Sequence, residues 1–217
     1  MEACIFDLDG VIVDTARFHF LAWKRLAKEL GIELTLQHNE KLKGVSRLES
    51  LNLILALKNL DLPENEKLRL AEKKNTWFLE FIHTMTPDDV YPGVQNLLDE
   101  LRSVGVKTGL ASSSKNAREV LKQLNITDQF AVIVDGTMIA YAKPHPEIFL
   151  KTANLLDTPP SHCVVIEDAA AGVAAAKSAG MGCVGVGDKS VLNQADLVVT
   201  QIAQLSWSVL NRIVQPT

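Results

Sequence analysis

Short runs of apolar residues alternate with amphipathic stretches along most of the chain. Uninterrupted apolar runs are typical of strands that are buried on both faces of a parallel sheet. The stretches between them carry apolar residues three and four positions apart, which predicts helices with one buried face. The predicted strands are 3–7, 106–112, 131–135, 163–168 and 183–187. The predicted helices between them are 94–103, 115–124, 146–156 and 168–179. This alternation predicts an α/β fold with a Rossmann-like parallel sheet, right-handed crossovers and flanking helices.

Residues 16–86 have a different pattern. They contain no strand-like run, and apolar residues recur at helical spacing over 16–30, 46–58 and 64–83. We therefore expect a helical cap domain (15–87) inserted into a core domain made of 1–14 and 88–217. Pro87 and Pro92 flank the return of the chain to the sheet.

Composition narrows the class of protein. The chain has 217 residues, of which 47% are hydrophobic and 22% are charged, and its net charge is −4. This balance is ordinary for a globular protein and argues against a nucleic-acid partner. Neither a membrane-spanning run nor a secretory leader is evident, so we expect no membrane partner and a cytoplasmic location. A monomer is the default expectation. The cysteines lie in apolar runs and are expected to be reduced core residues: Cys4, Cys163 and Cys183.

Two aspartates end the first predicted strand. Asp7 and Asp9 are two positions apart on an extended chain, so their side chains point to the same side. Gly10 permits the turn that follows. An Asx turn at the end of the strand is the alternative explanation.

Polar residues also follow other predicted strands, and ligands of α/β sheets gather at these carboxyl ends. Ser112 begins a serine-rich turn before a helix, where anions are favoured. Lys143 lies between two strands, and Glu167 and Asp168 follow four apolar residues. Taken singly, the serine turn is better explained by helix capping, Lys143 by a surface loop, and the acidic pair by an ordinary helix start.

The segment CIFDLDGVIVDT (4–15) resembles the opening motif of the haloacid dehalogenase superfamily, DxDGVxxDT. The serine, lysine and acidic segments follow in the superfamily's order and cover the whole predicted sheet domain. The resemblance implies that Asp7 attacks phosphorus, that Asp9 donates and accepts a proton, and that Ser112 and Lys143 hold the phosphoryl group. An ionised nucleophile beside a proton donor suits this division of labour. Mg²⁺ would be held by Asp7, the Asp9 carbonyl and Asp168, with Glu167 as a ligand or a support.

Segments of the predicted cap resemble the β-phosphoglucomutases within that superfamily: HFLAW (19–23), KLKGVSRLESL (41–51) and AEKKN (71–75). The resemblance implies binding of a sugar phosphate by His19, Trp23, Gly44, Val45, Ser46, Arg47, Lys74, Asn75, Ser114, Lys115 and Asn116. The planar fork of Arg47 is suited to gripping a second phosphate that does not react. Packing is the alternative for His19 and Trp23, and a solvated helix position is the alternative for Arg47.

The resemblance implies a Mg²⁺-dependent isomerase of carbohydrate metabolism. It would interconvert β-D-glucose 1-phosphate and β-D-glucose 6-phosphate through β-glucose 1,6-bisphosphate. A sugar- or polyol-phosphate phosphatase of the same superfamily is the main alternative. A non-catalytic sugar-phosphate sensor should have lost a functional group, and none is missing. We assign no role to His145, and we expect Asp14 and Thr15 to cap the first cap helix or to lie at the hinge.

Overall fold

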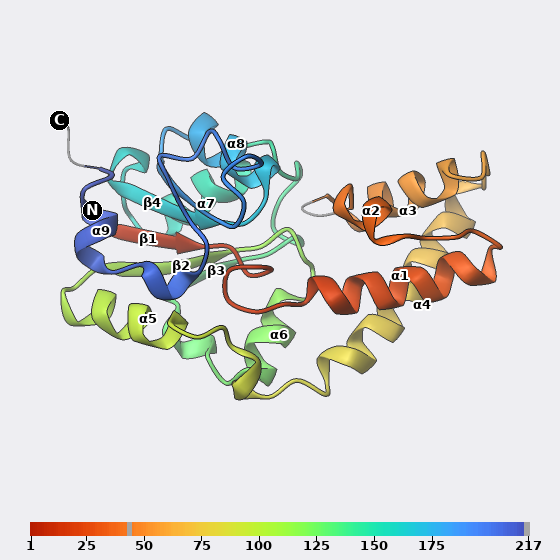
Figure 1. The fold of residues 1–217 in the computed structure, drawn as a ribbon, viewed down its shortest axis with the longest axis horizontal. Helices are drawn as coiled ribbons and strands as arrows, with labels where there is room; N and C mark the ends of the chain where they lie inside the picture. The colour runs from red at the N-terminus through yellow and green to blue at the C-terminus, as the bar shows by residue number, and fades with distance from the viewer. Residues whose placement is uncertain (43–44, 215–217) are drawn as a thin grey trace.

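A six-stranded parallel sheet forms the centre of the computed structural model, which describes residues 1–42 and 45–214 (Figure 1). The strands are β1 (Ala3–Phe6), β2 (Lys107–Ala111), β3 (Val132–Val134), β4 (Cys163–Glu167), β5 (Gly182–Val186) and β6 (Leu197–Val199). Their order is β3-β2-β1-β4-β5-β6, so β1 lies between β2 and β4. The five predicted strands are confirmed to within one residue at each end. The short edge strand β6 was not predicted, because its three residues are only half-buried.

Helices cover both faces of the sheet (Figure 1). One face packs against α7 (Glu147–Leu155) and α8 (Ala170–Ser178). Two clusters of buried apolar side chains form the core, and the first includes this face with α7 and α8. The second cluster contains residues of α5 (Val94–Ser103), α6 (Ala117–Gln123) and α9 (Trp207–Asn211). The side chains of β1 alternate between the two clusters, and all are fully buried. Such burial is worth about 1.5–3 kcal/mol for a side chain such as Phe6, which explains the uninterrupted apolar run.

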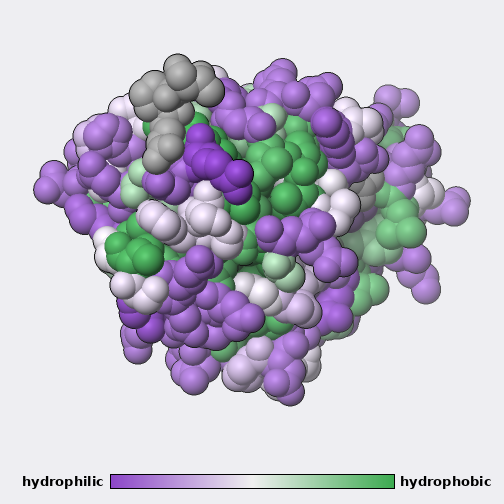
Figure 2. Space-filling model, turned by 60° about the vertical axis from the view of Figure 1, so that its left-hand side comes forward, coloured by the Kyte–Doolittle hydropathy of each residue, from purple (hydrophilic) through white to green (hydrophobic). Residues whose placement is uncertain are grey.

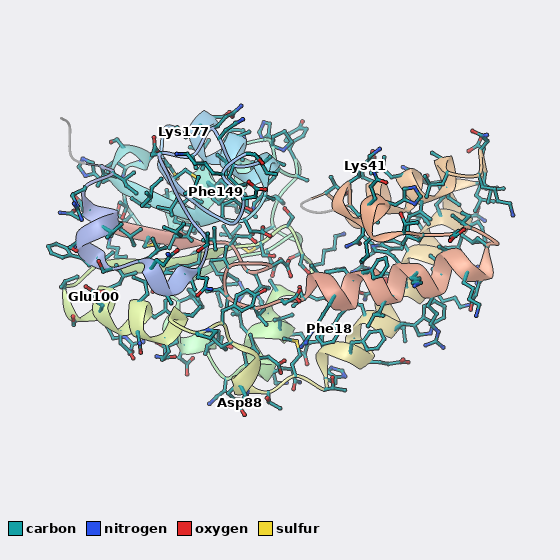
Figure 3. The ribbon with its side chains drawn as sticks, in the orientation of Figure 1. Phe18, Lys41, Asp88, Glu100, Phe149 and Lys177 are labelled. Carbon is teal, nitrogen blue, oxygen red and sulfur yellow. The ribbon has the colours of Figure 1, made fainter. Side chains whose placement is uncertain are left out.

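Four helices between β1 and α5 lie beside the carboxyl ends of the strands (Figure 1). They are α1 (Ala16–Glu29), α2 (Leu36–Glu40), α3 (Arg47–Ala56) and α4 (Glu64–Ile82). The three helices predicted in this region correspond to α1, α3 and α4, whereas the one-turn α2 was not predicted. The long helices α1 and α4 pack together, and Phe18, labelled in Figure 3, stacks on Phe81 with ring centroids 5.6 Å apart. Short 3₁₀ helices lie at Pro87–Asp89, Thr127–Gln129, Pro160–His162 and Ile202–Gln204.

The segment that enters α1 lies beside the segment that leaves α4. Val13 bridges to Val90, and the Tyr91 backbone N–H donates to the Ile12 carbonyl at 2.9 Å. Asp14 caps α1 as expected, because its Oδ1 accepts from the Arg17 backbone N–H at 3.2 Å. Thr15 is the N-cap residue of α1, although its side chain makes no capping hydrogen bond.

The surface and the cysteines agree with an ordinary α/β protein. The face shown in Figure 2 is mostly hydrophilic, with separate hydrophobic areas. All three cysteines are buried free thiols, as predicted. Within the described part of the chain, no helix has the length and apolar character needed to span a membrane.

Candidate active site

The polar residues predicted at the strand ends meet at one edge of the sheet. Phe6, the last residue of β1, pairs with Leu110 of β2 and with Ile166 of β4. The next residue, Asp7, therefore lies beside the end of β4, and its backbone N–H donates to the Ile166 carbonyl at 2.9 Å. Parallel strands in register thus place residues from distant parts of the sequence together.

Lys143 joins the ends of β1 and β4. Its Nζ donates to Asp7 Oδ1 at 2.6 Å and to Glu167 Oε2 at 2.7 Å. All three side chains are almost completely buried, with exposed fractions of 2%, 8% and 2% for Lys143, Asp7 and Glu167. Burial lowers the pKa of Lys143, but the two carboxylates more than compensate and raise it above its usual value. Lys143 is therefore a permanent cation at this site.

The two aspartates of the first motif have different surroundings. Burial and the neighbouring Glu167 raise the pKa of Asp7 well above its usual range, and Lys143 opposes that shift. Burial raises the pKa of Asp9 to about 6, with Lys143 again acting in the opposite direction. Asp9 Oδ1 is buried without a hydrogen-bond partner among the described residues. Asp9 can therefore exchange a proton near neutral pH, while Asp7 contacts the fixed cation.

Asp7, Glu167 and Asp168 could hold a metal ion. One carboxylate oxygen from each lies within 4.8 Å of the others. An all-oxygen donor set fits a hard cation, and three carboxylates exceed the single charge of Lys143. Gly10 is needed beside this cluster: its φ is +77°, and a Cβ there would lie 2.1 Å from Asp168 Oδ2. The backbone after Asp9 thus approaches Asp168 as closely as only glycine allows.

The serine-rich turn after β2 lies against the sheet end. Ser112 is 1% exposed, and its Oγ accepts from the Ser114 backbone N–H at 3.1 Å. Ser114 Oγ in turn accepts from the Asn116 backbone N–H at 3.2 Å. A Cβ on Gly136 would lie 2.2 Å from the Ser113 carbonyl oxygen, so the loop after β3 packs tightly on this turn. These contacts fix the backbone N–H groups of the turn at the start of α6.

Two basic residues and a histidine come from the helices α1 to α4, which we call the helical layer. Lys74 of α4 is 2% exposed, and its Nζ lies 2.7 Å from His19 Nδ1. The His19 ring stacks on Phe78, while Lys74 Nζ lies 4.7 Å from the centre of the Trp23 ring. Burial lowers the pKa of both His19 and Lys74 well below their usual values. The positive charges of Lys74 and Arg47 lower the pKa of His19 further. A neutral His19 therefore accepts the hydrogen bond from Lys74.

Arg47 begins α3 and contacts two residues of α4. Its Nη1 donates to Glu72 Oε2 at 3.0 Å, and its Nη2 donates to Asn75 Oδ1 at 2.8 Å. Asn75 Oδ1 also accepts from Asn116 Nδ2 at 2.8 Å. This last bond connects the helical layer to the turn after β2.

A cavity of about 460 Å³ lies between the two sets of groups. We define the sheet side of the cavity as Asp7, Asp9, Lys143, Glu167 and Asp168. We define its helical side as Arg47, Glu72 and Lys74. Most of the predicted site residues line this cavity: Asp7, Asp9, His19, Trp23, Val45, Ser46, Arg47, Lys74, Ser114, Lys115, Asn116, Lys143, Glu167 and Asp168. Ser112 does not line it and lies beneath the turn, and Gly44 falls outside the described residues.

Four polar residues that line this cavity were not among the predicted site residues. They are Asn39, Ser50, Glu72 and Ser113. Ser113 Oγ is buried and has no hydrogen-bond partner among the residues that the structure describes. No sequence signal marks Glu72, because residues two apart on a helix, such as Glu72 and Lys74, do not share a face.

Comparisons with known proteins identify the family to which the sequence and the fold are similar. The model of the haloacid dehalogenase-like hydrolase family matches residues 1–180. A beta-phosphoglucomutase of Bacillus subtilis is 47% identical over 97% of this chain and 94% of its own length. A phosphorylated carbohydrates phosphatase of Thermotoga maritima is 38% identical over 83% of this chain and 82% of its own length. The crystal structure of a beta-phosphoglucomutase from Clostridium difficile superposes with a TM-score of 0.96 at 45% identity, covering 99% of this chain and 97% of that one.

Proposed function

The chain belongs to the haloacid dehalogenase-like hydrolase family, and from that premise we propose that it interconverts β-D-glucose 1-phosphate and β-D-glucose 6-phosphate. The reaction would run through β-glucose 1,6-bisphosphate. The observation that carries the proposal is that cationic groups face one cavity from two opposite sides. Lys143 is on the sheet side, and Arg47 and Lys74 are on the helical side. A bisphosphate needs both sets, whereas hydrolysis of a monoester needs only the first.

Asp7 and Asp9 would carry the chemistry. In the first half, the 6-hydroxyl of β-glucose 1-phosphate attacks phosphorus on phosphorylated Asp7 while Asp9 takes the hydroxyl proton. The bisphosphate then turns round in the cavity. Asp7 attacks the phosphorus at C1, and Asp9 returns the proton to the C1 oxygen, which releases β-glucose 6-phosphate. A pKa of about 6 lets Asp9 act in both directions.

Lys143 and the turn after β2 would hold the transferring group. Lys143 neutralises charge on Asp7 and on the phosphoryl oxygens, because it lies 2.6 Å from Asp7 Oδ1. Ser112 would orient that group from beneath the turn. Phosphoryl transfer depends mainly on such positioning and charge stabilisation.

We propose Mg²⁺ as the metal, held by the carboxylates of Asp7 and Asp168 and the backbone carbonyl of Asp9. When bound, it supplies positive charge to the transferring phosphoryl group. Glu167 would support the site rather than bind the metal, because its Oε2 accepts from Lys143 and its Oε1 accepts from the Asp168 and Ala169 backbone N–H groups.

Residues 15–87 would act as a cap domain over the core domain of 1–14 and 88–217. Closure of the cap excludes water, so that a sugar hydroxyl rather than water attacks phosphorylated Asp7. The Asn75–Asn116 bond is a contact that closure would use. Trp23 and His19 would form the wall beside the sugar, with residues 45–47 and the turn 114–116 around the second phosphate.

The setting of the proposed enzyme follows from its other features. Three buried free thiols suit a reducing cytoplasm. We propose a monomer, in which one chain lines the described part of the cavity. Sugar phosphates are the proposed partners, and the net charge of −4 does not favour nucleic acid.

A sugar-phosphate phosphatase is the second candidate, and the 38% identity to the Thermotoga maritima phosphatase favours it. One assay separates the two. The protein is given β-glucose 1-phosphate, Mg²⁺ and a trace of the 1,6-bisphosphate, and glucose 6-phosphate and free phosphate are measured together. If the protein is a mutase, we expect conversion of β-glucose 1-phosphate to glucose 6-phosphate with little release of free phosphate. Release of phosphate at the rate of substrate loss would refute it and support the phosphatase.

A further inference from the structure

Arg47 on the helical side of the cavity is already paired with an acidic residue. Its Nη1 donates to Glu72 Oε2 at 3.0 Å, and its Nη2 donates to Asn75 Oδ1 at 2.8 Å. Both terminal nitrogens of the guanidinium therefore have protein partners. These bonds use two of the five N–H donors of the guanidinium, so a phosphate that binds Arg47 from their side competes with these partners.

The two partners differ in how easily they can leave. Asn75 is 7% exposed, and its amide also accepts from Asn116 and donates to Glu72 Oε1 at 3.3 Å. The side chain of Glu72 is 69% exposed, whereas that of Arg47 is only 22% exposed. Glu72 can turn into solvent without burying its charge, while Asn75 would lose three hydrogen bonds. Glu72 is therefore the partner that an incoming anion displaces.

We propose that Glu72 is a specificity-determining residue: an exchangeable counter-ion that occupies Arg47 until the non-reacting phosphate of the substrate takes its place. The inference rests on the proposed function, because it concerns the second phosphate site. A phosphate ester carries up to two charges and three acceptor oxygens, compared with one charge and two oxygens for a carboxylate. A phosphate therefore binds Arg47 more strongly than the Glu72 carboxylate that it replaces. A monoanion such as acetate has the same charge and number of oxygens as Glu72 and gains no such advantage.

The neutral variant Glu72→Gln tests this exchange. The amide keeps the size of the side chain and an acceptor oxygen, but it removes the competing charge. We expect inorganic phosphate to bind metal-free protein about two- to fivefold more tightly at low salt, which is the range that an exposed ion pair supports. The gain should shrink as salt is added, because salt screens the pair. Acetate, used as a competitor of phosphate, should compete better in the variant than in the unchanged protein.

Two further variants make the measurement specific. In the Arg47→Gln background, Glu72→Gln should give no gain in phosphate affinity, because the competition acts through Arg47. Glu66→Gln is the matched control: Glu66 lies on the same helix and pairs with Arg69 at 2.6 Å, but it does not line the cavity. That control should leave phosphate affinity unchanged. In steady-state assays with β-glucose 1-phosphate, Glu72→Gln should act on KM rather than on kcat, and Glu72→Asp, which keeps the charge, should restore KM.

Each result decides the matter. An unchanged affinity in Glu72→Gln, or an equal gain with and without Arg47, overturns the exchange. Weaker binding in Glu72→Gln also overturns it, because Glu72 would then hold Arg47 in place for the phosphate. The single variant Arg47→Gln tests the proposed function separately. If it binds phosphate as well as the unchanged protein, the second phosphate site is wrong whatever Glu72 does.

Discussion

Replacing Lys143 by methionine tests the electrostatic basis of the sheet side of the cavity. The change keeps the length of the side chain but removes the ammonium that lies 2.6 Å from Asp7 and 2.7 Å from Glu167. Both carboxylates stay buried and lose their shared cation. Removal of one partner from a buried ion pair costs about 3–5 kcal/mol. With a urea dependence of about 2 kcal/mol per molar, the midpoint of unfolding should fall by roughly 1.5–2.5 M.

The pH dependence gives the sharper prediction. Burial and repulsion from Glu167 raise the pKa of Asp7, and Lys143 lowers it. In Lys143→Met the pKa of Asp7 should therefore rise further. A carboxyl whose pKa is higher in the folded state binds protons on folding, so the variant gains stability as pH falls below that raised pKa. In metal-free buffer, the difference in unfolding free energy between the unchanged protein and Lys143→Met should therefore be larger at pH 8 than at pH 5.5.

A matched exposed pair provides the control. Lys73 lies 2.6 Å from Glu29, but the two side chains are 39% and 43% exposed. Lys73→Met should cost at most about 1 kcal/mol, with no such dependence on pH. Equal costs for the two variants, or a Lys143→Met deficit that does not change with pH, would refute the argument that burial sets the strength of the Lys143 contacts.

Other predictions concern single groups. Asp7→Asn should prevent formation of the phospho-enzyme, which mass spectrometry detects after incubation with the 1,6-bisphosphate. A phosphorylated variant would exclude Asp7 as the nucleophile. The change should leave the fold as stable as before, because it removes the repulsion between Asp7 and Glu167. Gly10→Ala should weaken Mg²⁺ binding at least tenfold in a calorimetric titration, because its Cβ would overlap Asp168, and normal affinity would contradict the close approach. The cysteines should resist a thiol reagent at pH 8 in the native protein and react fully in denaturant, because burial raises their pKa, that of Cys183 to about 12; rapid labelling of the native protein would contradict their burial.

Much of the fold could be predicted because burial leaves a clear record in the sequence. Strands covered on both faces appear as uninterrupted apolar runs, as in β1 and β4, and helix α5 was predicted with its observed bounds. The elements that were missed are short or lie at an edge. β6 and α2 have three and five residues, too few for either the strand or the helix period to stand out. The five-residue α9 was missed for the same reason.

The candidate site was partly predictable for a different reason. Its sheet-side residues follow strands, and the rule that parallel strands end at one edge brings them together without any knowledge of side-chain contacts. Glu72 illustrates what this rule leaves out. It meets Arg47 across 25 positions of sequence, and that contact depends on how α3 packs against α4. A glutamate on a charged helix gives no sign of such a partner, so its role needs the tertiary structure.

The charges around the cavity imply an asymmetry between its two sides. The sheet side has four carboxyl groups and one lysine, so it repels a phosphate unless a metal cation is added. The helical side has Arg47 and Lys74 against a single carboxylate, that of Glu72, which can turn into solvent, so it repels a phosphate less than the sheet side does. The non-reacting phosphate can therefore bind before a metal ion is present, whereas the reacting phosphate needs one. Phosphate binding in metal-free protein consequently reports on the helical side alone, which makes that measurement the cleanest test of the second phosphate site.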